Sequence, residues 1–221
     1  AVGLPGQGID SAVKDFKNLD GLSVPVIGSI YGYKIEQFGH VTKKMASLKP
    51  ALIEVDISCP HLDYGKPYDA DPKLAAEVTK EVKKNSGKIP ISIKLSPNVH
   101  DIKEIAHAAE RAGADAITAI NTVTSMIIDI DARKPILANK IGGMSGPALK
   151  PIAVRCVYDI YETVKIPIIG TGGITYGKDA IEMVMAGATG IGIGSGIYYR
   201  GMDIFKKVCN EMESWMKKNK I

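Results

Sequence analysis

The sequence predicts an α/β protein built on a parallel sheet. Short β-branched apolar runs alternate with amphipathic segments of helical length along the chain, which is the pattern of strands covered by helices in βα units. The apolar runs end on small or polar residues, at the edge where parallel α/β folds bind ligands. We therefore expect a TIM (β/α)8-type barrel in which about six of the eight units are recognisable.

The six predicted strands share a short apolar core and a small or polar end. They span residues 24–30, 51–58, 90–96, 116–121, 167–171 and 190–194. The predicted helices that follow them span residues 35–48, 72–85, 102–112, 151–164, 178–186 and 203–218. Because the sequence begins abruptly at Ala1-Val2-Gly3, we expect about two N-terminal units to be missing, and we treat residues 1–221 as a single, N-terminally incomplete barrel domain.

Composition fits one large soluble domain, with 221 residues, 45% hydrophobic and 24% charged. No window approaches the roughly 18 apolar residues of a membrane span, and no leader-like segment opens the chain, so we expect a cytoplasmic protein. Cys59, Cys156 and Cys209 are widely spaced, which predicts reduced thiols rather than disulfides or a zinc site. The net charge of +4 is concentrated in a Lys-rich C-terminal helix face, which argues against nucleic-acid binding.

Two neighbouring predicted strands each carry one polar face. Alternation places Glu54, Asp56 and Ser58 on one face of the second strand, and Lys94 between two serines on one face of the third. We expect both faces to point into the barrel. A lysine there needs an anionic neighbour, which Asp56 or an electron-rich cofactor would supply. The alternative is a purely structural Asp56–Lys94 pair.

Glycine-rich segments close the last two predicted strands. Gly170-Thr171-Gly172-Gly173 and Gly192-Ile193-Gly194-Ser195-Gly196 resemble the phosphate site of barrel enzymes, because glycine lets backbone N–H groups approach phosphate oxygens closely. A third segment, Gly142-Gly143-Met144-Ser145-Gly146, lies near the end of residues 122–147, a break of a length typical of lids or cofactor walls. The pattern leaves open whether the phosphate belongs to a cofactor or to a substrate.

Seven short motifs follow one another along the whole chain. They are Val2-Gly3-Leu4-Pro5, Asp56-Ile57-Ser58-Cys59-Pro60-His61, Ile93-Lys94-Leu95-Ser96-Pro97-Asn98, Ile120-Asn121-Thr122, Lys134-Pro135-Ile136-Leu137-Ala138-Asn139, Gly142-Gly143-Met144-Ser145-Gly146-Pro147 and Gly170-Thr171-Gly172-Gly173. Together they resemble the dihydroorotate dehydrogenase family. The fifth and sixth motifs are most similar to the branch that pairs with an iron–sulfur flavoprotein subunit and passes electrons to NAD.

The resemblance implies a bound FMN and the oxidation of (S)-dihydroorotate to orotate in pyrimidine biosynthesis. Cys59, which matches the cysteine of the family's Ser-Cys-Pro motif, would take the proton from C5 while hydride leaves C6 for flavin N5. A thiol with an ordinary pKa of about 8.5 is a fair base where its site favours the thiolate. The alternative is a buried structural thiol.

The other site residues also follow from the resemblance. Lys94 matches the lysine beside the flavin ring, and Asn121 and Thr122 match the pair that binds the substrate. The residues that match the flavin phosphate cradle are Gly143, Gly172, Gly173, Gly194 and Ser195. Thr122 and Ser195 could equally be capping or turn residues.

Asp56 and His61 depart from the family pattern, which has asparagine at both positions. They remain substrate-binding candidates because they flank Cys59. A carboxylate only accepts hydrogen bonds and would repel an anionic substrate or reduced flavin unless Lys94 neutralises it. Histidine at this place also occurs in the related dihydropyrimidine dehydrogenases. A further substrate-contacting asparagine and the first flavin-binding lysine of the family would precede Ala1.

Three alternatives stay open: a related flavin barrel acting on another dihydropyrimidine, a flavin-free barrel with a phosphorylated substrate, and a catalytically impaired subunit. On the main interpretation, the partners are dihydroorotate and an iron–sulfur/FAD electron-transfer subunit, and the chain forms a homo-oligomer. No metal, nucleic acid or membrane partner is expected.

Overall fold

The computed structural model describes residues 6–16, 22–58 and 68–221, and a six-stranded sheet lies at its centre. Its strands are β1 (Ile27–Ile30), β2 (Leu52–Asp56), β3 (Ile91–Leu95), β4 (Ala116–Ala119), β9 (Ile168–Thr171) and β10 (Gly190–Gly192). They lie side by side in that order, and every neighbouring pair is parallel. This is the strand succession of a TIM-type barrel, so the predicted fold is confirmed as a partial barrel.

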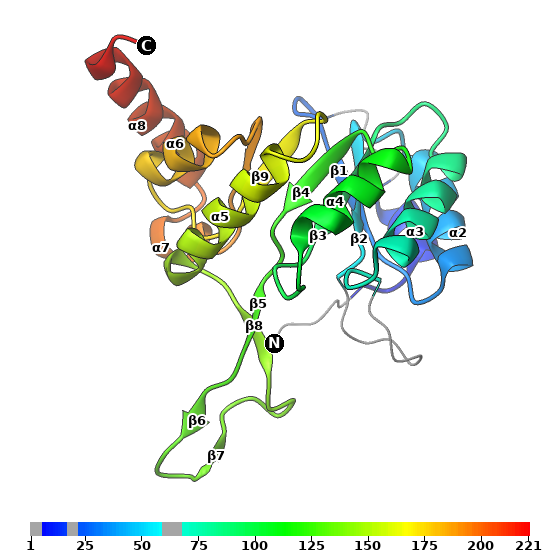
Figure 1. Cartoon of the computed structure of the whole chain (residues 1–221), viewed down its shortest axis with the longest axis horizontal. Helices are drawn as coiled ribbons and strands as arrows, with labels where there is room; N and C mark the ends of the chain where they lie inside the picture. Colours follow the sequence, from blue (N-terminus) through cyan, green and yellow to red (C-terminus); the bar gives the residue numbers. More distant parts are fainter. Residues whose placement is uncertain (1–5, 17–21, 59–67) are drawn as a thin grey trace.

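Helices follow the strands along the chain and pack against one another in sequence (Figure 1). They are α2 (Ile35–Ala46), α3 (Pro72–Asn85), α4 (Ile102–Arg111), α5 (Lys150–Tyr161), α6 (Gly177–Met185) and α8 (Ile204–Asn219). Two short helices, α1 (Ile9–Asp15) and α7 (Gly196–Arg200), were not predicted. No helix within the described ranges is long and apolar enough to cross a membrane.

Helix α4 illustrates how the sequence specifies these elements. The side chain of Asp101 accepts a hydrogen bond from the backbone N–H of Lys103, which satisfies one of the free donors at the start of the helix. Ile102, Ile105 and Ala109 are buried on one side of the helix. Their spacing of three and four residues is that of a single helical face, which packs against the sheet and the neighbouring helices.

The two faces of the sheet differ in polarity. Ile53 and Val55 of β2 are completely buried, whereas Glu54 and Asp56, which alternate with them, are only partly buried. Strand β3 repeats this arrangement, since Lys94 lies on the face opposite the buried Ile93 and Leu95. The predicted alternation is therefore confirmed, and it brings ionisable side chains of two adjacent strands to the same face.

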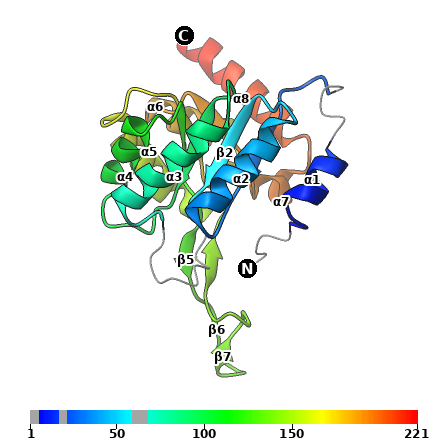
Figure 2. The same cartoon turned by 90° about the vertical axis from the view of Figure 1, so that its right-hand side faces the viewer.

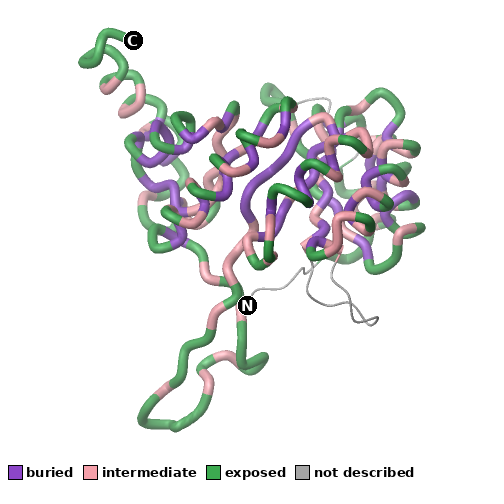
Figure 3. Tube along the Cα trace, viewed as in Figure 1, coloured by how far each residue is buried: buried purple, intermediate pink, exposed green. Residues whose placement is uncertain are grey.

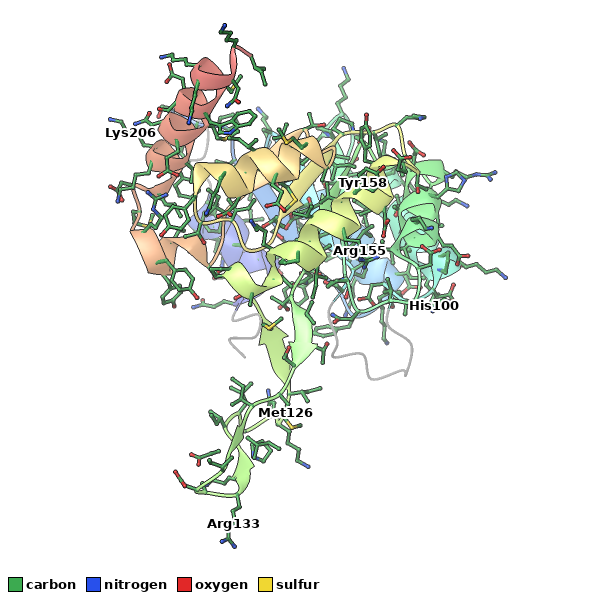
Figure 4. The ribbon with its side chains drawn as sticks, turned by 60° about the vertical axis from the view of Figure 1, so that its left-hand side comes forward. His100, Met126, Arg133, Arg155, Tyr158 and Lys206 are labelled. Carbon is green, nitrogen blue, oxygen red and sulfur yellow. The ribbon has the colours of Figure 1, made fainter. Side chains whose placement is uncertain are left out.

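The long break after β4 forms an arm, residues 123–144, made of two nested pairs of antiparallel strands. Strand β5 (Val123–Ser125) pairs with β8 (Gly142–Met144), and β6 (Ile128–Asp129) pairs with β7 (Lys134–Pro135). The arm projects away from the helices and the sheet in both ribbon views (Figures 1 and 2). It is mostly exposed (Figure 3), and Met126 and Arg133 lie along it, remote from Arg155 on α5 (Figure 4).

Candidate active site

A polar cluster joins the carboxyl ends of β2 and β4. The Asp56 carboxylate accepts hydrogen bonds from the Ser58 backbone N–H at 2.9 Å and from the Ser58 hydroxyl at 2.5 Å. The Asn121 side-chain amide approaches the two Asp56 oxygens at 3.3 and 3.4 Å and also contacts the Ser58 hydroxyl. The hydrogen-bond partners of Asp56 among the described residues are all donors, which is how a carboxylate is accommodated at a position where the family pattern has an amide.

Lys94 lies between two carboxylates. Its ammonium nitrogen is 3.6 Å from Glu54 Oε1 and 4.0 Å from Asp56 Oδ2. The Asp56–Lys94 pair was predicted, but the shorter Glu54–Lys94 contact was not. Its signal was already in the sequence, because alternation along β2 places Glu54 on the same face as Asp56.

Asn121 and Thr122 are held in place by each other and by residues at and after the end of β3. The Asn121 backbone N–H donates to the carbonyl of Leu95 at 2.8 Å, and the Asn121 side-chain oxygen accepts from the Thr122 backbone N–H at 2.7 Å. Asn98, which the sequence analysis did not single out as a site residue, donates to the Thr122 carbonyl at 2.9 Å and accepts from the Thr124 backbone N–H at 2.9 Å. Asn98 therefore ties the end of β3 to the base of the arm.

Gly143 has a packing role at the base of the arm. A Cβ atom at this position would lie 2.0 Å from the Thr122 hydroxyl oxygen, a distance that no side chain tolerates. Glycine is therefore required for β8 to approach Thr122. The structure gives this steric reason for Gly143, and its predicted role toward a phosphate stays a prediction.

The glycine turn after β9 packs against the start of α5. Gly172 and Gly173 have φ angles of 133° and 76°, a region that favours glycine. A Cβ atom on Gly173 would lie 2.7 Å from the backbone nitrogen of Lys150. Lys150 itself donates to Asp179 at 2.9 Å and to Glu182 at 2.6 Å, so its charge is already paired.

Adjacent backbone amides remain available at the ends of β9 and β10. These strands are parallel neighbours, with Gly192 opposite Thr171, so the turns that follow them lie at the same edge of the sheet. Within the described chain, no acceptor takes a hydrogen bond from the amides of Gly172, Gly173, Gly194 or Ser195. A group of donors at one edge suits a phosphate.

Asp69 is a buried carboxyl that interacts with Ser96 and with Asp56 of the polar cluster. It was not among the predicted site residues. It is only 7% exposed. Burial raises the pKa of Asp69 above its ordinary value, a hydrogen bond from Ser96 opposes the rise, and the negative charge of Asp56 adds to it. The folded protein therefore favours the protonated form of Asp69 more than the unfolded chain does.

We expect Asp69→Asn to raise the thermal unfolding midpoint at neutral pH. A carboxyl whose pKa is raised on folding contributes stability fully below its unfolded pKa of 3.8, and the contribution is lost as the pH rises through the folded pKa. The neutral amide avoids this loss of stability, so the unfolding midpoint should rise by something on the order of a few degrees. This rise in the midpoint should shrink as the pH falls toward about 4. Asp131→Asn, at an exposed position of the arm, is the control. A gain that is absent at neutral pH would contradict this account of Asp69.

Cys59 and His61 lie outside the described residues, so their predicted roles stay predictions. The two described cysteines are placed differently. Cys156 is buried in α5, where burial raises the pKa of its thiol, and Cys209 is exposed on α8. Neither belongs to the polar cluster around Asp56 described above.

Comparison with known proteins identifies the family. The family model for dihydroorotate dehydrogenase matches residues 1–216. The chain belongs to the dihydroorotate dehydrogenase family. It is 51% identical to the "Dihydroorotate dehydrogenase B (NAD(+)), catalytic subunit" of Methanocaldococcus jannaschii, over the whole chain and 73% of the relative. Proteins of the same name are 44% identical in Pyrococcus horikoshii, over 98% of the chain and 71% of the relative, and 42% identical in Citrifermentans bemidjiense, over 100% and 73%.

The predicted membership of the dihydroorotate dehydrogenase family, including its NAD-linked branch, is confirmed. The family consists of flavin-dependent oxidoreductases that act on a CH–CH bond. Membership alone assigns no individual residue, so the site residues predicted here, including Lys94, Asn121 and Thr122, stay predictions of role even though the structure defines their positions.

Proposed function

We propose that this chain is the catalytic subunit of an enzyme that oxidises (S)-dihydroorotate to orotate in pyrimidine biosynthesis, with FMN as its flavin. The observation that carries the proposal is the Asp56–Asn121–Lys94 cluster at the carboxyl ends of the strands of a dihydroorotate dehydrogenase chain. Polar groups of both signs meet there, which suits a small substrate with amide and carboxylate groups.

The described residues fit FMN at both ends. Lys94 on β3 offers a positive charge for the ring, and the free amides after β9 and β10 offer donors for the phosphate. Strand β10 lies three places from β3 in the sheet, which at about 4.8 Å per strand separates the two ends by roughly 14 Å. That span suits an elongated ligand with a ring at one end and a phosphate at the other.

The reaction divides between the cofactor and the chain's own residues. When bound, FMN supplies the acceptor for the hydride that leaves C6 of dihydroorotate. Cys59 removes the proton from C5 as the general base. Asn121, with its side-chain amide fixed between Asp56 and the Thr122 N–H, and Thr122 orient the substrate, and Lys94 stabilises the negative charge that accumulates on the flavin side.

The electrons then leave through a partner. The relatives are named as catalytic subunits of NAD(+)-linked enzymes, and we propose that this chain likewise pairs with an iron–sulfur/FAD subunit that reduces NAD. Self-association into a homo-oligomer is part of the same proposal.

The proposal requires the protein to retain FMN. We expect the full-length protein, incubated with FMN and passed through a gel-filtration column, to elute with visible flavin absorbance at about one flavin per chain. Gly173→Ala is the matched variant, because its Cβ would collide with the backbone of Lys150 and distort the phosphate turn, so it should elute with much less flavin. Elution of the unaltered protein without flavin would reject the proposal.

Asp56 favours a second candidate, a flavin enzyme for another dihydropyrimidine. A carboxylate accepts hydrogen bonds and repels anions, so it would suit a neutral dihydropyrimidine better than the anionic dihydroorotate. Anaerobic reduction of the bound flavin by dihydroorotate and by dihydrouracil separates the two. Faster reduction by dihydrouracil would favour the second candidate.

A further inference from the structure

Glu54 links three adjacent strands at the face that carries Lys94. Ser29 of β1 lies directly opposite Glu54 of β2 in the sheet register, and Asp56 lies opposite Lys94 of β3. The Ser29 hydroxyl donates to Glu54 Oε1 at 3.0 Å, and the Lys94 ammonium lies 3.6 Å from that same oxygen. The hydroxyl on β1 therefore fixes the carboxylate oxygen that faces the ammonium on β3.

The surroundings make this contact electrostatically important. The side chain of Glu54 is 16% exposed and that of Lys94 is 24% exposed, so water screens the pair much less than it screens a surface ion pair. Within the described chain, Glu54 and Asp56 are the only carboxylates within ion-pair distance of Lys94. One cation thus balances two carboxylates, and a change in either carboxylate changes the charge that Lys94 presents to a ligand.

Glu54 and Asp56 have different hydrogen-bond partners. The Lys94 ammonium is 3.6 Å from Glu54 and 4.0 Å from Asp56. Asp56 accepts hydrogen bonds from Ser58 and Asn121. The partners of Glu54 among the described residues are Ser29 and Lys94 alone. Asp56 therefore interacts mainly with Ser58 and with Asn121, a proposed substrate-binding residue. Glu54 interacts mainly with Lys94.

We propose that Glu54, anchored by Ser29, is a positioning residue that holds the Lys94 ammonium in place and offsets part of its charge, and so sets the midpoint potential of the bound flavin. This inference rests on the proposed function, because it takes Lys94 as the cation beside the flavin ring. A carboxylate close to that cation disfavours the added negative charge of the reduced flavin. Glu54 therefore keeps the potential lower than Lys94 alone would allow.

The test is the midpoint potential of the flavin in the full-length protein loaded with FMN, measured by spectroelectrochemical titration. Glu54→Gln keeps the shape of the side chain and removes its charge. We expect it to favour the reduced flavin by at least about tenfold, which for a two-electron couple is an upward shift of about 30 mV. Glu77→Gln, at an exposed position of α3, removes the same charge far from Lys94 and should leave the potential unchanged.

Ser29→Ala provides a second, independent variant that leaves every charge in place. Loss of the hydroxyl releases the Glu54 carboxylate from its anchor, so we expect a smaller shift in the same upward direction. The inference is overturned if the midpoint potential of Glu54→Gln equals that of Glu77→Gln or is shifted downward. It is also overturned if the midpoint potential of Ser29→Ala equals that of the unaltered protein. If the unaltered protein retains no FMN, the proposed function itself fails. Retention of FMN with unmoved potentials rejects the role of Glu54 alone.

Discussion

Cys59→Ala is expected to retain FMN but to lose most of its reduction by dihydroorotate. The residues proposed to hold FMN are Lys94 and the glycine turns, so removing the thiol leaves flavin binding intact. Without a general base, the C5 proton has no acceptor in the protein, and loss of such a group costs roughly 10²–10⁴-fold in rate. Stopped-flow absorbance under anaerobic conditions measures this rate directly.

Two further variants make the Cys59 result specific. Cys59→Ser should reduce the flavin slowly but measurably, because a serine hydroxyl can serve as the base but is less acidic than a thiol and is therefore ionised much more rarely. Cys209→Ala removes an exposed thiol on α8 and should behave like the unaltered protein. An undiminished rate in Cys59→Ala would exclude Cys59 as the base.

Lys94→Gln has the second largest expected effect. The substitution leaves Glu54 and Asp56 on adjacent sites of one face with no cation between them, and it removes the positive charge proposed to stabilise the reduced flavin. Loss of one preorganised electrostatic group typically costs about 10²–10³-fold in rate. We therefore expect slower flavin reduction, weaker FMN retention and a lower midpoint potential, opposite in direction to Glu54→Gln.

Lys103→Gln is the matched control for Lys94→Gln. Lys103 is half exposed on α4 and pairs only with the nearby Asp101 among the described residues, so its loss removes the same charge from the outer surface. Flavin reduction and potential should be unchanged in this variant. Equal behaviour of the two lysine variants would contradict the placement of Lys94 beside the flavin.

The strands and main helices were predictable because each depends on local patterns. Strand β3 was predicted over residues 90–96 and is observed over Ile91–Leu95, and helix α3 matches its prediction at both ends. Pro72 at its first turn and the Asp71 cap fix its start. The paired strands of the arm were missed because two- and three-residue strands have too few residues to show an alternating pattern.

The roles of the predicted site residues stay predictions, but the structure shows which of the described ones lie together. The motifs indicated Asp56, Lys94 and Asn121, and the strand order shows why they converge. Alternation along β2 places Glu54 on the same face as Asp56, but the distance from Glu54 to Lys94 depends on the register between the strands. The contact of Asn98 with Thr122 depends on the path of a loop, which no local pattern specifies. Gly143 was predicted only as part of the phosphate cradle. The structure adds a second reason for this glycine, because a Cβ atom there would collide with Thr122.

Anaerobic titration of the FMN-loaded, full-length protein with dihydroorotate measures whether the chain oxidises this substrate. We expect about one equivalent of dihydroorotate to bleach the visible absorbance of one flavin and an equal amount of orotate to be formed. A flavin that stays oxidised in the presence of excess dihydroorotate, in a protein that retains FMN, would contradict the proposed function.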